Sequence, residues 1–86
     1  MDENEIDEIT KEVFEILKKK NKTYGDGNIS KIGQLGILTR IEEKTEKLKN
    51  MIKNDIIDEE SVEDNWKDVV GYGILGLLVK RDKWGK

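Results

Sequence analysis

Apolar residues recur every three or four positions along three segments of this 86-residue chain, and no proline interrupts any of them. That spacing places the apolar side chains on one face of an α-helix. Proline is the residue that most strongly kinks or ends a helix, so a chain without proline can form long helices. The pattern therefore predicts an all-α fold: three main helices in an antiparallel bundle, forming a single domain over residues 1–86.

The first helix is predicted over residues 3–20, with acidic residues at its start and lysines at its end, as the helix dipole favours. The second is predicted from residue 29 or 30 to residue 53, and the third over residues 60–81. Gly33 and Gly36 fall inside the second helix, where each glycine costs about 1 kcal/mol relative to alanine. They therefore indicate close packing or an irregular first turn.

The third predicted helix is apolar on two faces. One face carries Val62, Trp66, Val69, Gly73 and Leu77, and the other carries Tyr72, Leu75 and Val79. Such a helix is buried on two sides, and the two other helices of so short a chain cannot easily cover both. We therefore expect a homo-oligomer, a dimer or a tetramer, in which another subunit covers the second face. Ile56 and Ile57, in the break before this helix, are expected to fill the core.

Composition excludes several kinds of chemistry. The chain has no Cys and no His, which removes disulfides, thiolate metal sites, cysteine nucleophiles and histidine bases. A net charge of −3 argues against a nucleic-acid partner. The longest apolar stretch, 69–79, is too short to cross a bilayer, and the acidic first ten residues are unlike a signal peptide. We expect a cytoplasmic protein with no membrane partner.

Two clusters of carboxylates have spacings that bring side chains together on a helix surface. The cluster in the second helix is Glu42, Glu43 and Glu46, and the cluster in the third helix is Glu60, Asp64 and Asp68. Carboxylate oxygens are the ligands that Mg²⁺ prefers, often together with substrate phosphates. Acidic residues are also common in the first turn of a helix and on salt-bridged solvated faces, so both interpretations stay open.

Four short motifs carry a resemblance to a known family. They are residues 22–26 (KTYGD), 36–44 (GILTRIEEK), 58–64 (DEESVED) and 67–72 (KDVVGY). Their order resembles that of the nucleotide-modification-associated domain of phages and their bacterial hosts. That family is thought to be related to the MazG-like all-α nucleoside triphosphate pyrophosphatases. The resemblance covers roughly residues 11–80.

The resemblance implies Mg²⁺-dependent hydrolysis of a nucleoside triphosphate to the monophosphate and pyrophosphate. Its implied metal ligands are Glu43, Glu46, Asp64 and Asp68, and its implied catalytic residues are Glu43 and Glu60. The implied nucleotide-binding residues are Arg40 and Lys44 for the phosphates, with Trp66 or Tyr72 for the base.

The chain departs from the family pattern at two positions. Asn65 stands three residues before Asp68, where the MazG-like motif has an acid, and Gly71 stands where the family has Asn. These departures affect catalysis more than binding. The alternatives are a non-catalytic nucleotide binder that sequesters a signalling nucleotide, and a helical module for protein interaction.

Overall fold

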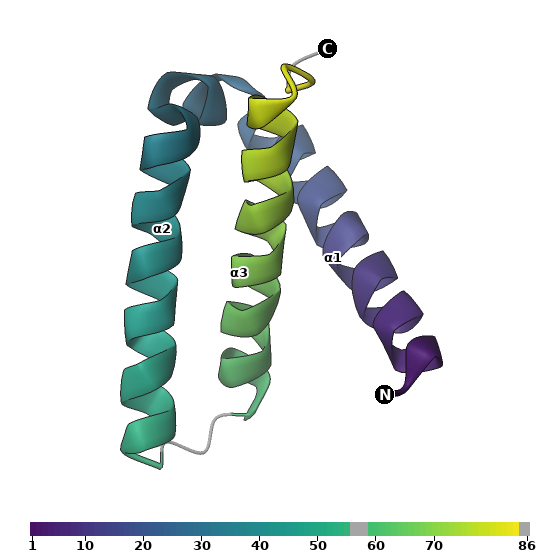
Figure 1. Ribbon diagram of the computed structural model, residues 1–86, viewed down its shortest axis with the longest axis vertical. Helices are drawn as coiled ribbons and strands as arrows, with labels where there is room; N and C mark the ends of the chain where they lie inside the picture. The colour runs from purple at the N-terminus through teal and green to yellow at the C-terminus, as the bar shows by residue number, and fades with distance from the viewer. Residues whose placement is uncertain (56–58, 85–86) are drawn as a thin grey trace.

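Three α-helices make up the computed structural model, which describes residues 1–55 and 59–84, without the side chains of residues 59–61. They are α1 (Glu3–Tyr24), α2 (Gly27–Lys53) and α3 (Glu59–Lys80), and the described residues contain no strand. α2 and α3 run antiparallel, side by side, while α1 lies at an angle to them and diverges from α3 toward the N-terminus (Figure 1). The predicted all-α fold of three main helices is confirmed.

The connection between α1 and α2 is shorter than the sequence predicts. The break predicted over residues 21–28 is wrong, because α1 continues to Tyr24 and α2 begins at Gly27. A single residue ends α1: Gly25 has a φ of 72°, and its N–H donates a hydrogen bond of 2.7 Å to the Asn21 carbonyl oxygen. One glycine is therefore sufficient to stop the helix, and the polar residues before it remain helical.

Gly33 divides α2 into a short first segment and a long second one. Its φ of 61° and ψ of −164° lie outside the helical region. Side chains are disfavoured at this φ, so glycine is the residue that permits the kink. The expectation of an irregular start to this helix is confirmed.

The main core lies where all three helices meet. Ile29 and Ile37 of α2 and Leu75 of α3 are buried there, and Leu17 of α1 packs against them. α1 packs closely against α3 at Gly71, where a Cβ atom would lie only 3.3 Å from Leu17 Cδ2. A side chain at this position would press against α1, so a glycine here allows the two helices to pack.

The end of the chain returns to the start of α2. Trp84 Nε1 donates a hydrogen bond of 2.9 Å to the carbonyl oxygen of Asp26. The chain turns between α3 and Trp84 through Asp82, which has a φ of 53°. Trp84 thereby covers the turn between α1 and α2.

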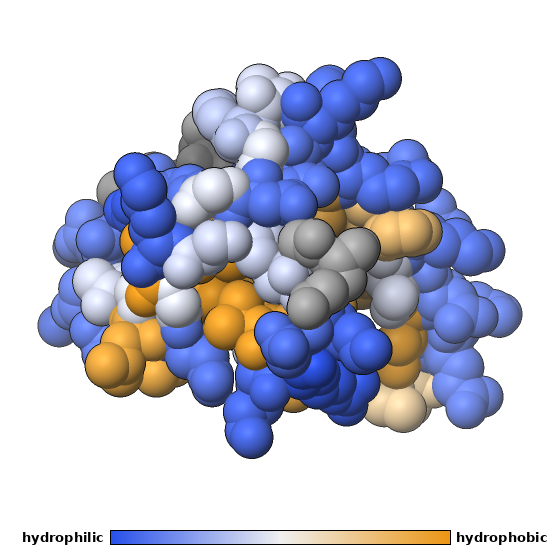
Figure 2. Space-filling view, turned by 90° about the horizontal axis from the view of Figure 1, so that it is seen from above, coloured by the Kyte–Doolittle hydropathy of each residue, from blue (hydrophilic) through white to orange (hydrophobic). Residues whose placement is uncertain are grey.

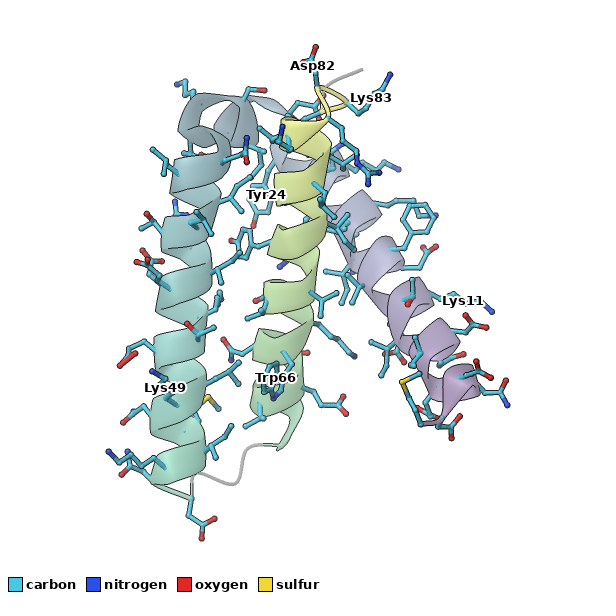
Figure 3. All side chains as sticks on the ribbon, viewed as in Figure 1. Lys11, Tyr24, Lys49, Trp66, Asp82 and Lys83 are labelled. Carbon is cyan, nitrogen blue, oxygen red and sulfur yellow. The ribbon has the colours of Figure 1, made fainter. Side chains whose placement is uncertain are left out.

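Trp66 lies on one of the two apolar faces of α3, and in the single chain its side chain is exposed and projects from α3 toward solvent (Figure 3). The prediction that Ile56 and Ile57 fill the core falls outside the described residues. No helix in the described part of the chain is long and apolar enough to cross a membrane.

Candidate functional site

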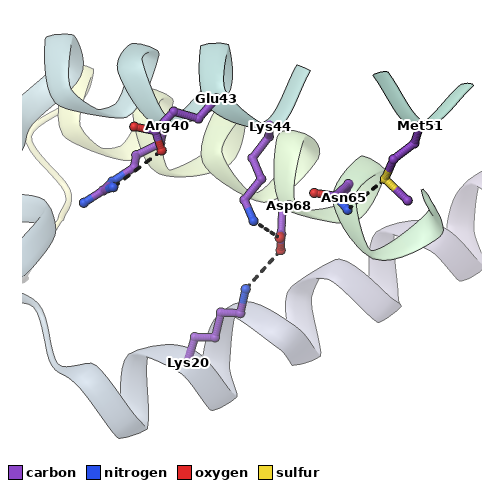
Figure 4. A network of polar contacts seen from close by, with 7 residues as sticks. All are labelled: Lys20, Arg40, Glu43, Lys44, Met51, Asn65 and Asp68. Atoms are coloured by element: carbon purple, nitrogen blue, oxygen red, sulfur yellow. Dashed lines mark hydrogen bonds and ion pairs between the residues drawn. The ribbon is translucent and has the colours of Figure 1, made fainter. Parts of the chain in front are cut away.

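The Asp68 carboxylate joins all three helices. It extends from α3, and Lys20 Nζ of α1 lies 3.0 Å from its Oδ1. Lys44 Nζ of α2 lies 3.1 Å from its Oδ2 (Figure 4). Each carboxylate oxygen therefore accepts a charge-assisted hydrogen bond, and the two donors belong to different helices. The cluster of two ammonium groups and one carboxylate carries a net charge of +1.

Burial and ion pairing shift the pKa of Asp68, whose side chain is 19% exposed, in opposite directions. Partial burial raises the pKa of its carboxyl group. The hydrogen bonds from Lys20 and Lys44, together with their positive charges, lower it by more, so the pKa lies below its ordinary value of 3.8. Asp68 is therefore ionised at neutral pH.

A cavity of about 340 Å³ opens beside this cluster, between α1, α3 and the turn that Trp84 covers. Its volume is at the lower end of the range typical of small-molecule sites. The apolar wall consists of Val13, Ile16, Leu17, Ile29, Gly71 and Leu75. The rest of the lining consists of Gly25 and of aromatic, charged or amide-bearing residues: Lys20, Asn21, Tyr24, Asn28, Lys67, Asp68, Tyr72 and Trp84.

Lys67 contributes a second ammonium group to the cavity wall. Its Nζ lies 3.3 Å from Glu12 of α1 and 3.8 Å from Glu63, one turn earlier in α3. The hydrogen bond to Glu12 is the main reason why the pKa of Lys67 is raised above 10.5, and the nearby carboxylates add to it. Lys67 is therefore a permanent cation, and it provides a second link between α1 and α3.

The predicted ligands on α2 lie on a different surface. Glu43 pairs with Arg40 at 3.6 Å, and Glu46 pairs with Lys49 at 4.0 Å. Both are i,i+3 pairs on one helix, and all four side chains are well exposed. The structure therefore places Arg40, Glu43 and Glu46 on a salt-bridged, solvated face of α2, away from Asp68. This is one of the two interpretations that the sequence allows.

The predicted acidic cluster on α3 is brought together only in part. Asp64 is exposed and lies near enough to Lys67 to raise its pKa, while Asp68 is bound by lysines. The side chain of Glu60 lies outside those described. Among the described residues, no three acidic side chains converge on one point. These placements give no support for a shared Mg²⁺ site, which stays a prediction.

The two aromatic candidates for base binding are separated. Tyr72 lines the cavity, whereas Trp66 lies on an exposed face of α3. Lys44 is the other predicted residue in the network, where it binds Asp68. Sequence reasoning did not single out Lys20, although it lies near the end of α1, close to the turn where separate helices meet.

Taken together, the geometry defines a small all-α protein with a cavity lined by aromatic and lysine side chains next to a half-buried carboxylate. No protein-family model, curated protein or solved structure matches the chain. The resemblance to the nucleotide-modification-associated domain therefore stays a prediction.

Proposed function

We propose that this protein binds a nucleotide in the cavity between α1 and α3. The observation that carries the proposal is the composition of the cavity wall, which combines three aromatic side chains with two ammonium groups. Tyr24, Tyr72 and Trp84 provide aromatic surface, on which a base can stack. Lys20 provides positive charge next to it, whereas Glu12 and Glu63 balance the charge of Lys67.

Charge favours an anionic ligand over a neutral one. Lys20 shares Asp68 with Lys44, so the three charges do not cancel. Lys20 is also the more exposed of the two lysines, and its long side chain can turn from Asp68 toward a phosphate without leaving the cavity mouth. Lys44 then remains paired with Asp68, so this half-buried carboxylate keeps one of its two partners.

Binding without hydrolysis is the alternative that the carboxylates favour. A catalytic carboxylate has to activate water beside the bound phosphate, and hydrogen bonding to two ammonium groups makes Asp68 a poor base. Glu43 and Glu46 are exposed on α2 and pair with Arg40 and Lys49, not with the network. Mg²⁺-dependent hydrolysis stays a prediction, with Glu60 and Asp64 as its remaining acidic candidates on α3.

Fluorescence of Trp84 tests the proposal directly. Trp66→Phe leaves Trp84 as the single tryptophan, and Trp66 does not line the cavity. Titration of this variant with nucleoside mono-, di- and triphosphates, each with and without Mg²⁺, should change Trp84 emission in a saturable way. Phosphate release and pyrophosphate release measured on the same samples should stay at background.

Lys20→Met and Lys18→Met form a matched pair for this titration. Both lysines are on α1, but Lys20 lines the cavity, whereas Lys18 pairs with Glu15 on the surface. Lys20→Met should weaken binding about tenfold, and Lys18→Met should leave it unchanged. Equal affinity of both variants, or no change in emission at millimolar nucleotide, would rule out this site. Mg²⁺-dependent turnover would instead establish the hydrolase.

A further inference from the structure

α2 and α3 expose a row of apolar side chains each. On α2 the row consists of Leu38 and Ile52, with Thr45 midway between them, so its members are seven residues apart. On α3 it consists of Val62, Trp66, Val70, Gly73 and Leu77, spaced by four, four, three and four. Leu38, Ile52, Trp66 and Leu77 are each more than half exposed. Both spacings keep the row on one face of its helix.

Both rows lie on the side of the α2–α3 pair that faces away from α1. Lys44 and Asp68 mark the side toward α1, because Lys20 of α1 joins them there. On α2, the row and Lys44 lie on opposite sides of the contact with α3. On α3, the row and Asp68 lie on opposite sides of the contact with α2. Trp66 stands on this side in Figure 3, in front of the α3 ribbon, and hydrophobic atoms gather over α2 at the lower left of Figure 2. The two rows therefore form one apolar face, two helices wide, which we name the outer face.

The outer face has its midpoint at the same level on both helices. Leu38 and Ile52 each lie seven residues from Thr45, and Val62 and Leu77 lie seven and eight residues from Val69. Thr45 follows Lys44 in the sequence, and Val69 follows Asp68, and those two residues are in contact. A two-fold axis at this level, perpendicular to the helices, would superimpose each row on itself, and such self-complementarity is what a symmetric dimer requires.

Charges beside the α2 row have the same symmetry. Glu42 lies three residues before Thr45 and Lys49 lies four residues after it, on one flank of the row. Two antiparallel copies of α2 that cross at Thr45 place Glu42 of each copy within one residue of Lys49 of the other. In the single chain, Glu42 makes no ion pair within the described residues, and Lys49 makes one of 4.0 Å with Glu46.

We propose that the outer face binds the outer face of a second copy of this chain, with the two-fold axis passing beside Thr45. The product is an antiparallel four-helix bundle of α2 and α3 from each copy, with each α1 on the outside. Gly73 favours the close approach of the two copies, because nothing lies within 4 Å of the position of its missing Cβ. The cavity lies on the other side of α3, so association and nucleotide binding are separable.

Cross-linking through a single cysteine tests the position of the axis, since the chain has no cysteine of its own. Thr45→Cys places a thiol at the axis, where it lies close to its own symmetry mate. Thr39→Cys is the matched control: it is exposed six residues before Thr45 and about 120° around α2 from it, and both threonine hydroxyls bond to a carbonyl of the preceding turn. Oxidation at micromolar concentration should convert most of the Thr45→Cys chain, and little of the Thr39→Cys chain, to a covalent dimer.

Charge exchange tests the pairing independently. Sedimentation equilibrium should show dimerisation weakened about fivefold by Glu42→Lys and by Lys49→Glu, because each loses two equivalent ion pairs and gains repulsion. The double variant should regain wild-type affinity. Equal cross-linking of the two cysteine variants would overturn the proposal. A wild-type chain that remains a 10 kDa monomer at 100 times the concentration used for cross-linking would overturn it too. The outer face would then belong to a different protein.

Discussion

Replacing Asp68 with asparagine removes the negative charge that pairs with lysines of both other helices, Lys20 of α1 and Lys44 of α2. The expected result at neutral pH is a lower free energy of unfolding. The substitution keeps the shape of the side chain, so the change measures the carboxylate and not the packing. An asparagine also turns N–H groups toward ammonium groups that need an acceptor.

The size of the effect follows from the exposure of the three side chains. A hydrogen bond to a charged group contributes about 1.5–3 kcal/mol when it is buried, and an exposed ion pair contributes about 0–1 kcal/mol. Asp68 is 19% exposed, but Lys44 is 30% and Lys20 is 55% exposed, so solvent screens both pairs. We therefore expect Asp68→Asn to lower the stability by about 2 kcal/mol, with Lys44 accounting for the larger share.

Urea denaturation followed by circular dichroism gives this quantity, provided that all variants are compared at one protein concentration. Glu15→Gln is the control, because it makes the same chemical change in an exposed pair with Lys18 and should cost no more than about 0.5 kcal/mol. An Asp68→Asn protein as stable as the wild type, or more stable, would refute the account of this network. Greater stability is the result expected if Asp68 faced other carboxylates across a metal site.

Three further outcomes are expected. The pKa of Asp68 is lower in the folded protein than in the unfolded chain, so the unfolded chain binds more protons below about pH 4. The stability difference between wild type and Asp68→Asn should therefore stay constant from about pH 5 to 8 and shrink as the pH falls through the folded pKa. Urea titrations at each pH measure this difference. Gly73→Ala should raise the melting temperature of the monomer, because its Cβ meets nothing and alanine favours the helix by about 1 kcal/mol. Gly71→Ala should lose that gain, because its Cβ presses against Leu17. Equal shifts of the melting temperature in calorimetry at low concentration would contradict the close packing of α1 against Gly71. Gly33→Ala should lower the stability by about 1–2 kcal/mol in the same calorimetry, since φ there is 61°, and a stabilised variant would show that the kink is not required.

The helices could be predicted from the sequence because their signals are local. Apolar spacing and the absence of proline were sufficient to locate three helices, with ends displaced by a few residues. The largest error, at the turn after α1, arose because residues 21–24 have turn-forming side chains but no glycine. Gly25 alone stops α1, and its effect depends on one φ angle.

The site was harder to predict because its residues meet only in three dimensions. Lys20 and Asp68 are 48 residues apart, and neither spacing nor composition indicates that they form an ion pair. Carboxylates at i,i+4 positions looked like a metal site, although lysines from two other helices already neutralise Asp68. The exposure of Trp66 in the single chain could not be predicted for a related reason, because an apolar helix face has the same spacing whether it is buried in the chain or exposed on the outer face.

The measurement that tests nucleotide binding most directly is a titration of the ¹⁵N-labelled chain, followed by amide and indole signals in nuclear magnetic resonance spectra. The chain has two tryptophans, Trp84 in the cavity wall and Trp66 on the outer face, so the indole of Trp66 is an internal control. The account predicts that a nucleotide shifts the Trp84 indole and the amides of Asn21 and Tyr72, while the Trp66 indole stays in place. Shifts centred on Glu43 and Glu46 of α2, or no shifts at millimolar nucleotide, would contradict it.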